Sequence, residues 1–456
     1  MKKEMFSTEI SILRDTFRRL LRRHAKTNII KLIDKTHPAD MALIFRYFND
    51  SEQDTVFAMM RPSEKTVEFL NELDEAITIR IVENETPSRI AEILEEASSN
   101  EQAYLMGLVE ETYAASVIDL FKAEEQEELE EMMAYPEDSA GILMYTDVFT
   151  LHEETRAREA IVALQDQEEA EMVFYLYAID NEGALTGVIS LRDLVTTPSD
   201  TMLKDIMTKK VHAVRPETDQ EEVARIVSQY NFLAVPVIDS DERLLGIVTV
   251  DDVVDVIREE ATEDFLKMVG AGEDREILLK SSWENARIRL PWLFASWVGG
   301  IIAAYIIGVF DNILQNTIAL AAFIPVIIGM GGNIGTQSST IIVRGIATGR
   351  IKLGNELKVL IKEIQVGFIL GILYGFLLGL FANYNFIQAD PFLGVVVGLS
   401  ICCSMIIAAA VGAFTPLILR KLDIDPAIAT GPFVTTSVDI LGVLLYFIIA
   451  GKFLNM

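Results

Sequence analysis

The residue with the clearest chemical potential is Asp439, a carboxylate inside an apolar stretch near the end of the printed sequence. Thr435 and Thr436 precede it by four and three residues, so a helix places all three on one face. A carboxylate at the centre of a membrane costs roughly 2.5–3.5 kcal/mol on insertion scales and is expected to face a cavity or a partner. No Lys or Arg lies at comparable depth in the other apolar stretches. The pattern favours a mobile cation as counter-ion, with a proton relay or a protonated, hydrogen-bonded Asp as the alternative.

A second polar segment interrupts an earlier apolar stretch at residues 329–340, with the sequence GMGGNIGTQSST. Glycines allow two helices to pack closely, which is one explanation of the segment. The amides of Asn333 and Gln337 fit that explanation less well, because amides in lipid need hydrogen-bonding partners. We therefore expect Asn333 and Gln337 to line a polar pathway together with Asp439, Thr435 and Thr436.

Five apolar stretches contain or flank these residues, and each is long enough to cross about 30 Å of hydrocarbon as a helix. Their predicted ranges are 290–310, 317–342, 357–382, 392–419 and 427–451. Two of the connections are basic, through Arg344, Arg350, Lys352, Lys358, Lys362, Arg420 and Lys421, and the other two contain no Lys or Arg. Because positive loops stay in the cytoplasm, the N-terminal region is predicted to be cytoplasmic and the C-terminus to lie outside.

The charge of the chain is divided unevenly. Residues 1–283 hold 60 Asp and Glu against 29 Lys and Arg, whereas residues 284–456 hold 8 against 10. An acidic soluble region is thus joined to a nearly uncharged apolar one. This balance argues against nucleic acid as a partner and favours cations. The two adjacent cysteines, Cys402 and Cys403, exclude a disulfide framework and a cysteine zinc site.

An internal repeat of about 60 residues occupies residues 138–260. LTGVISLRDLV at 185–195 matches LLGIVTVDDVV at 244–254, and each unit reads helix, strand, turn, strand, helix. The second strand of each unit ends in Ser/Thr-x-x-Asp. The repeat resembles a tandem pair of cystathionine-β-synthase-type (CBS) domains, which implies binding of an adenine nucleotide; the alternative is that each Asp caps the following helix. The implied nucleotide-binding residues are Ser190, Arg192, Asp193, Phe232, Thr249 and Asp252.

Residues 1–137 are predicted to be all-helical. Pro38, Pro62 and Pro87 recur 24 and 25 residues apart, and each precedes an amphipathic run. Proline suits the first position of a helix, and a period of about 25 residues indicates a short helical solenoid. A basic patch near the start consists of Arg18, Arg19, Arg22 and Arg23. We expect it to pack on acidic neighbours, with anionic lipid as the alternative.

The segment between the repeat and the first apolar stretch is rich in acids at helical spacing. Like charges at that spacing repel one another, and the usual explanation of such a run is a solvated helix face. Here the acids are dense, basic partners such as Arg258 and Lys267 are few, and the run leads directly to the membrane stretches. A regulatory cation site is the alternative that we favour.

The whole order of segments resembles the MgtE-type magnesium channels. The closest likeness lies in PVIIGMGGNIGTQSSTIIVR at 325–344, GPFVTTSVDILG at 431–442 and the DPA that begins at Asp425. The resemblance implies a homodimer whose pore lies on the two-fold axis and is lined by the second and fifth membrane helices. It also implies that Asp439 of each subunit binds the permeating ion.

The family's regulatory acids fall, residue by residue, on Asp219, Glu221, Asp252, Asp255, Glu260, Glu263, Asp264 and Asp425. Asn231 departs from the pattern, since the family has an acid there. The fold class that follows is multidomain: an all-α N-terminal solenoid, an α/β tandem CBS pair and a polytopic membrane domain of five helices. The predicted domains are 1–137 (acidic helical N-domain), 138–200 and 201–256 (CBS domains), 257–283 (acidic connecting helix) and 284–456 (membrane pore).

The function implied is that of a Mg²⁺ channel in the plasma membrane, not an enzyme. It imports Mg²⁺, is closed by intracellular Mg²⁺ bound to the acidic cytoplasmic domains, and is modulated by ATP; the expected partners are a second copy, membrane lipid, Mg²⁺ and an adenine nucleotide. Mg²⁺ gives up its waters reluctantly, so paired carboxylates could hold the hydrated ion. Oxygen ligands argue against zinc or copper but do not separate Mg²⁺ from Mn²⁺ or Co²⁺. The alternative is a CBS-regulated, ion-coupled transporter of Co²⁺ or Mn²⁺ in which Asp439 titrates.

Overall fold

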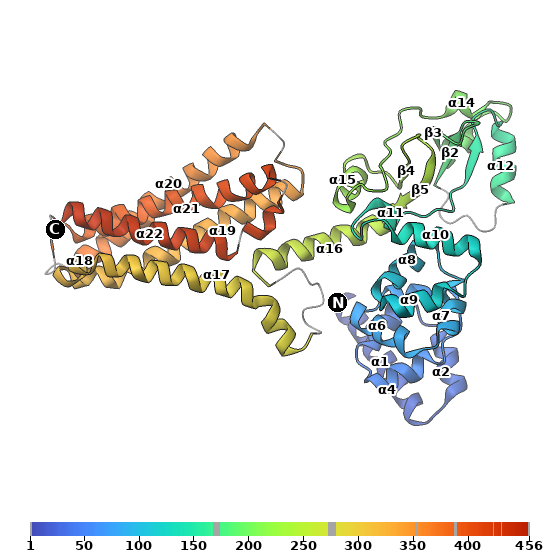
Figure 1. The fold of residues 1–456 in the computed structure, drawn as a ribbon, viewed down its shortest axis with the longest axis horizontal. Helices are drawn as coiled ribbons and strands as arrows, with labels where there is room; N and C mark the ends of the chain where they lie inside the picture. The colour runs from blue at the N-terminus through green and yellow to red at the C-terminus, as the bar shows by residue number, and fades with distance from the viewer. Residues whose placement is uncertain are drawn as a thin grey trace. The chain divides into compact units, whose positions relative to one another are not determined.

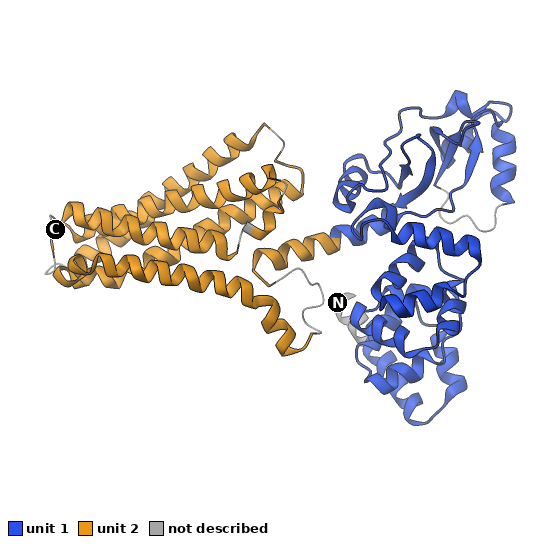
Figure 2. Cartoon of the chain, viewed as in Figure 1, with its two compact units in different colours: residues 1–257 blue, residues 258–456 orange. Residues whose placement is uncertain are grey.

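The computed structural model in Figure 1 describes residues 2–166, 174–271, 280–351, 354–386, 390–422, 424–429 and 431–454. The chain divides into two compact units, residues 1–257 and 258–456, which Figure 2 colours separately. Part of the predicted acidic connection (272–279) and Lys352 lie outside the described residues.

Unit 1 begins with short helices stacked around a continuous apolar core, as the solenoid prediction expected. Pro38 and Pro87 occupy the first turn of α3 and α7, where the missing N–H costs nothing. Pro62 differs from our prediction, because α5 begins two residues later, after the N-terminal flanking residue Ser63. The helices are α1 (Lys2–Arg22), α2 (Lys26–Ile33), α3 (Pro38–Phe45), α4 (Asp50–Phe57), α5 (Glu64–Asn71), α6 (Glu75–Asn84), α7 (Pro87–Leu94), α8 (Ser99–Leu108), α9 (Glu111–Ile118) and α10 (Ala123–Met133).

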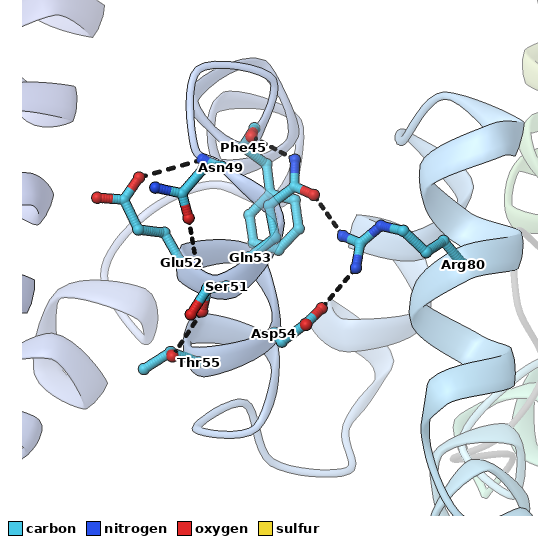
Figure 3. Close-up of polar contacts among 8 residues, drawn as sticks. All are labelled: Phe45, Asn49, Ser51, Glu52, Gln53, Asp54, Thr55 and Arg80. Atoms are coloured by element: carbon cyan, nitrogen blue, oxygen red, sulfur yellow. Dashed lines mark hydrogen bonds and ion pairs between the residues drawn. The ribbon is translucent and has the colours of Figure 1, made fainter.

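Polar contacts fix the stacking of these helices where apolar packing alone would allow sliding. Asn49 and Glu52 form a reciprocal capping box at the start of α4, which Figure 3 shows. The buried Gln53 donates to the carbonyl of Phe45 at 2.9 Å, and Arg80 of α6 bonds both Gln53 and Asp54. One arginine thereby ties α6 to α4.

The repeat folds into two small sheets, each flanked by helices in the predicted order. The first sheet pairs β1 parallel to β2 and β2 antiparallel to β3; the second pairs β4 antiparallel to β5. Bridging hydrogen bonds near Ala184 and Arg243 join the two repeats. The elements are α11 (Ala140–Leu143), β1 (Thr150–His152), α12 (Ala157–Gln165), β2 (Tyr175–Ile179), β3 (Leu185–Ser190), α13 (Leu191–Thr196), α14 (Leu203–Ile206), α15 (Gln220–Tyr230), β4 (Ala234–Ile238), β5 (Leu244–Thr249) and α16 (Val250–Met268).

Unit 2 holds five helical spans that are long and apolar enough to cross a membrane, among the described residues. This confirms the five predicted membrane helices, although the first begins about eight residues earlier than predicted. The spans are α17 (Ser282–Val309), η1 with α19 (Ile318–Phe323 and Ile324–Ala347), α20 (Glu356–Asn385), α21 (Leu393–Lys421) and α22 (Pro432–Phe453). The short helices α18 (Asp311–Asn316) and η2 (Pro426–Ala429) lie in two of the connections.

Helices α20 and α21 approach each other more closely than side chains would allow. A Cβ built on Gly375 would lie 2.6 Å from the carbonyl oxygen of Gly398, and one on Gly379 would lie 2.7 Å from that of Gly394. Both distances are far below van der Waals contact, so any other residue would push the helices apart. This glycine seam lets backbone pack on backbone, which is how membrane helices gain dispersion energy without a hydrophobic driving force.

Candidate functional site

Helix α19 has one buried face and one exposed polar face. Ile334, Ser338 and Ile342 are buried against other helices of unit 2, whereas Asn333 and Gln337, one turn apart, are exposed. Exposed amides cannot face hydrocarbon without loss of hydrogen bonds. The polar face of α19 therefore requires water or a second protein surface.

Asp439 lies on α22 next to this segment. Its Oδ1 is 3.9 Å from the position that a Cβ on Gly332 would take, so the missing side chain of Gly332 leaves room beside the carboxylate. Asp439 is half-buried, and no Lys or Arg pairs with it among the described residues. The structure thus brings Asp439 close to the backbone of the α19 polar segment and leaves its charge uncompensated by protein cations.

The two threonines before Asp439 have different surroundings. The Thr435 hydroxyl donates to the carbonyls of Gly431 and Pro432, both at 3.3 Å, in the first turn of α22. The Thr436 methyl packs so tightly on Gly299 of α17 that no Cβ would fit there. Helical spacing predicted that Thr435 and Thr436 share the helix face of Asp439. In the structure, the packing against Gly299 directs Thr436 toward α17.

A second carboxyl group inside the membrane unit, Glu363 on α20, was not singled out from the sequence. It is 7% exposed, and the buried Ser338 donates to its Oε2 at 2.8 Å. Ser338 follows Gln337 directly, so this bond ties the buried side of α19 to α20. In the sequence Glu363 directly follows Lys362 in the charged beginning of α20, so it lacks the signal that marks Asp439, which is an acid alone in an apolar span.

We expect Glu363→Leu to destabilise unit 2 by about 1–3 kcal/mol, because the Ser338 hydroxyl loses its buried acceptor. Glu363→Gln keeps a carbonyl oxygen there and is the matched control. Thermal unfolding in detergent and ion flux in proteoliposomes should both fall for the Leu variant and stay near wild type for Gln. A Leu variant as stable as wild type would show that the bond does not hold α19.

The end of α16 carries a cluster of predicted regulatory acids around one lysine. Lys267 contacts Glu263, four residues before it, and donates to Asp425 Oδ2 at 2.7 Å. Burial opposes the charge of Lys267, but these hydrogen bonds outweigh it and raise its pKa. Burial, followed by the charge of Asp425, raises the pKa of Asp264 beside them. The structure brings Glu263, Asp264 and Asp425 together with a protein cation already among them.

The other predicted acids are spread over unit 1 and α16. Asp219 caps α15 and accepts from the Glu221 N–H at 2.8 Å; Asp255 is exposed on α16, and Glu260 follows it on the same helix. No cluster of three or more His, Cys, Asp or Glu with metal-binding geometry occurs in the described ranges. Asn231, the departure from the family pattern, ends α15 with a left-handed φ of 55°, a conformation that Asn tolerates.

Asp252 has the most perturbed carboxyl group of unit 1. Burial raises its pKa to about 7, the charges of Asp251 and Glu101 add to this, and the Thr249 hydroxyl, donating at 2.6 Å, opposes it. Near and above neutral pH the folded protein therefore holds a carboxylate that is costly to ionise. A bound cation would remove that cost.

This pKa predicts the effect of Asp252→Asn in the absence of Mg²⁺. The unfolded carboxyl ionises near pH 3.9, so ionisation favours the unfolded wild-type chain as pH rises toward 7 and has no further effect above it. The variant should therefore melt slightly above wild type near pH 4.5, by a growing margin up to about pH 7, and by a constant margin beyond. Thermal melts in chelator across this range check the prediction; a margin independent of pH would contradict it.

The predicted nucleotide residues lie at two turns and one aromatic stack. Ser190, rather than Asp193 as in the capping alternative, is the N-cap of α13: its Oγ accepts the Asp193 N–H and donates to Asp193 Oδ2 at 2.7 Å. Arg192 and Asp193 are nonetheless exposed. Phe232 stacks on Tyr230 with centroids 5.4 Å apart, and Tyr230 on His212 at 4.3 Å. Tyr230 and His212 were not predicted; the stack is the kind of surface on which a planar base packs.

Comparison with known proteins agrees with this arrangement along the whole chain. A divalent cation transporter model, MgtE, matches residues 324–449, and a model of the MgtE intracellular N domain matches 36–138. CBS domain models match 140–200 and 203–259. These ranges cover α3 to α10, the repeat, and α19 to α22 up to residue 449.

Similar curated proteins and solved structures carry related names. The magnesium transporter MgtE of Bacillus subtilis (strain 168) is 32% identical over 425 residues, 93% of each chain. The magnesium transporter MgtE of Thermus thermophilus is 38% identical over 341 residues, 74% of this chain and 75% of that one. A crystal structure of the cytosolic domain of the Mg²⁺ channel MgtE in complex with ATP covers 53% of this chain and 99% of its own, with 33% identity and a TM-score of 0.51.

Proposed function

Because this chain belongs to the MgtE family of magnesium transporters, we propose that it is a Mg²⁺ channel whose pore is lined by α19 and α22. It is a membrane transporter and not an enzyme. The observation that carries the channel proposal is the half-buried Asp439 carboxylate, which has no protein cation beside it in the described residues and lies along the polar segment of α19.

The mechanism of selection follows from the chemistry of the hydrated ion. Mg²⁺ holds its water shell tightly and in octahedral geometry, so a pore that accepts the hydrated ion avoids the cost of stripping it. The Asp439 carboxylate would accept hydrogen bonds from those waters and compensate the charge. The amide groups of Asn333 and Gln337 would bond further waters.

The pore requires a second subunit in this proposal. A single chain exposes the amides of Asn333 and Gln337 on the outer face of α19, where lipid cannot satisfy them. A homodimer with its two-fold axis along this face would enclose them and place two Asp439 carboxylates around one ion, in an isologous arrangement.

The proposed orientation in the membrane rests on the charges of the connections. Among the described residues, Arg344, Arg350, Lys358, Arg420 and Lys421 lie at the ends of membrane helices that share one side with the beginning of α17. Positive loops favour the cytoplasmic side, which supports a cytoplasmic unit 1 and an outer position for the end of α22. In a channel of this orientation, Mg²⁺ flows inward when its electrochemical gradient points inward.

The experiment that separates channel from coupled transporter is flux in proteoliposomes with Mg²⁺ varied separately on each side. A channel should pass Mg²⁺ down its gradient with no proton gradient present. Dependence on a proton gradient, or flux of Co²⁺ or Mn²⁺ in place of Mg²⁺, would favour the ion-coupled alternative in which Asp439 titrates.

Closure by intracellular Mg²⁺ is the regulatory part of the proposal. Two observations support it. Residues 1–283 carry a net charge of −31, and α16 adds a run of acidic side chains along its length. Without divalent ions these acids repel; Mg²⁺ bound between them would favour a closed state. Asp219, Glu221, Asp252, Asp255, Glu260, Glu263, Asp264 and Asp425 remain the proposed ligands.

ATP is the proposed modulator at the CBS pair, supported by the exposed Asp193 and the aromatic stack of Phe232. Asp193→Ala or Asp252→Ala should weaken ATP binding by about tenfold or more, because a carboxylate bond to the ribose hydroxyls is lost. Calorimetry on the full chain in detergent measures this, with the exposed Asp200→Ala as control. No heat with wild type, or no loss in either variant, would remove the site.

A further inference from the structure

The basic face of α1 contrasts with the acidic character of the rest of unit 1. Residues 14–35 hold eight Lys and Arg and only two Asp, within a region whose net charge over residues 1–283 is −31. This whole stretch precedes residues 36–138, which the N-domain model matches. Neither ion conduction nor the proposed Mg²⁺ sites use these residues.

The two sides of α1 have opposite chemistry. Phe17 is fully buried, and Ile10, Leu13, Leu20 and Leu21 pack against the same core. On the other side Arg19, Arg22 and Arg23 are exposed, and so is 61% of Ile12. Arg19 follows Ile12 by seven residues, so helical geometry places both in one stripe, and Arg22 and Arg23 lie at its C-terminal end. The exposed stripe is thus cationic with an apolar residue at one end.

Internal pairing accounts for only part of this charge. A shallow hollow is lined by Asp15 and by four arginines, Arg18, Arg19, Arg22 and Arg23. Asp15 already forms a salt bridge with Arg14 at 3.0 Å. Arg18 donates to the carbonyl of Tyr47, and Arg19 to Thr16 at 3.5 Å. Arg19 and Arg22 lie in the last turn of α1, where cations interact favourably with the helix dipole, but this effect leaves the exposed guanidinium groups able to bond a further partner.

We propose that this α1 stripe, formed by Ile12, Arg19, Arg22 and Arg23, binds the phosphate groups of anionic lipids at a membrane surface. Guanidinium groups bond phosphate oxygens in pairs, and a cationic helix face beside an exposed apolar side chain is typical of helices that lie on membranes. Unit 2 carries five spans, so a bilayer is tethered to every copy of the chain and its effective concentration is high. This proposal rests on one part of the proposed function, the cytoplasmic location of unit 1.

The acidic remainder of unit 1 makes the contact selective. An anionic surface repels residues that carry net negative charge, so attraction is confined to the α1 stripe. Each arginine near such a surface strengthens binding about fivefold, and removal of three should weaken the contact on the order of a hundredfold. Charge reversal should abolish it.

The test uses the full chain in nanodiscs, with Cys402 and Cys403 replaced by Ala and a fluorophore on Thr27→Cys, an exposed position at the beginning of α2, four residues after Arg23. Headgroup spin-labelled lipid should quench the fluorophore in discs that contain about one third phosphatidylglycerol, and not in pure phosphatidylcholine discs. Arg19→Glu/Arg22→Glu/Arg23→Glu should lose the quenching. The matched control Arg158→Glu/Lys209→Glu/Lys210→Glu, exposed positions with the same charge change, should retain it.

Further experiments distinguish lipid headgroups from free inorganic phosphate and from RNA as the bound phosphate. Release of the stripe by low millimolar inorganic phosphate would indicate a free-anion site and overturn the lipid assignment, as would release by a short RNA at micromolar concentration. Equal quenching in pure phosphatidylcholine, or quenching that survives the triple reversal, would also overturn it. Circular dichroism confirms that the variants fold. Mg²⁺ flux of the same preparations is read independently, so failure of the channel proposal and failure of lipid binding are distinguishable.

Discussion

Replacement of Asp439 by alanine is expected to lower Mg²⁺ flux at least a hundredfold while the chain remains folded and assembled. The carboxylate is half-buried beside the gap left by Gly332 and has no basic partner in the described part of the chain. In the proposed dimer its loss removes both charges that face the ion. Dye-reported Mg²⁺ entry into proteoliposomes, with gel filtration of the same samples, measures the effect.

Two further variants decide what Asp439 contributes. Asp439→Asn keeps shape and hydrogen-bonding capacity but removes the charge, so it should also fail if electrostatic attraction dominates over hydration geometry. Asp311→Asn, in the short helix α18, removes an acid outside the proposed pathway and should conduct like wild type. Wild-type flux in the alanine variant would end the assignment of Asp439 to the pore.

Neutralisation of Asp252, Asp255, Glu260 and Glu263 together, to Asn or Gln, is expected to raise the Mg²⁺ concentration that half-closes the channel at least tenfold. Maximal flux should not change, because these residues are outside the proposed pore. A shift of a two-state equilibrium from 1:99 to 99:1 requires about 5.5 kcal/mol of differential binding. Several weak sites can supply this jointly, and linkage requires that the closed state bind Mg²⁺ more tightly.

The control for this variant removes the same charge from another acidic face. Glu124, Glu127, Glu130 and Glu131 are exposed on α10, and their change to Gln leaves the α16 acids intact. This control should close at the wild-type concentration. Protease protection of the α16 region by Mg²⁺ should fall only in the first variant. If the first variant closes like wild type, the acids of α16 form a solvated face and the sensor lies elsewhere.

Much of the fold could be predicted because its signals are local. Long apolar runs determine membrane spans, and alternating strand patterns with a repeated turn motif determine the CBS pair. The prediction for Pro62 failed because α5 starts two residues later, at a position where Ser63 can flank the helix. The boundaries predicted for the domains are not tested by these observations and remain predictions.

The parts of the site that could not be predicted depend on which helices meet. The bond from Ser338 to Glu363 joins residues 25 positions apart on different helices. The sequence marks Lys267 as one of few basic residues in an acidic segment. Its position between Glu263 and Asp425 could not be predicted, because Asp425 is 158 positions away in the sequence. Thr436 is directed to α17 because Gly299 leaves a space there, which no helical periodicity of α22 reveals.

The glycine seam between α20 and α21 has a practical consequence for anyone who attaches probes or evolves variants of this chain. Gly375, Gly379, Gly394 and Gly398 cannot accept even a methyl group without separation of the two backbones. Libraries that randomise these positions should return almost only glycine. Leu373 and Leu377, which are 50% and 52% exposed on the opposite face of the same helix, offer attachment points for spectroscopic labels that leave the seam undisturbed.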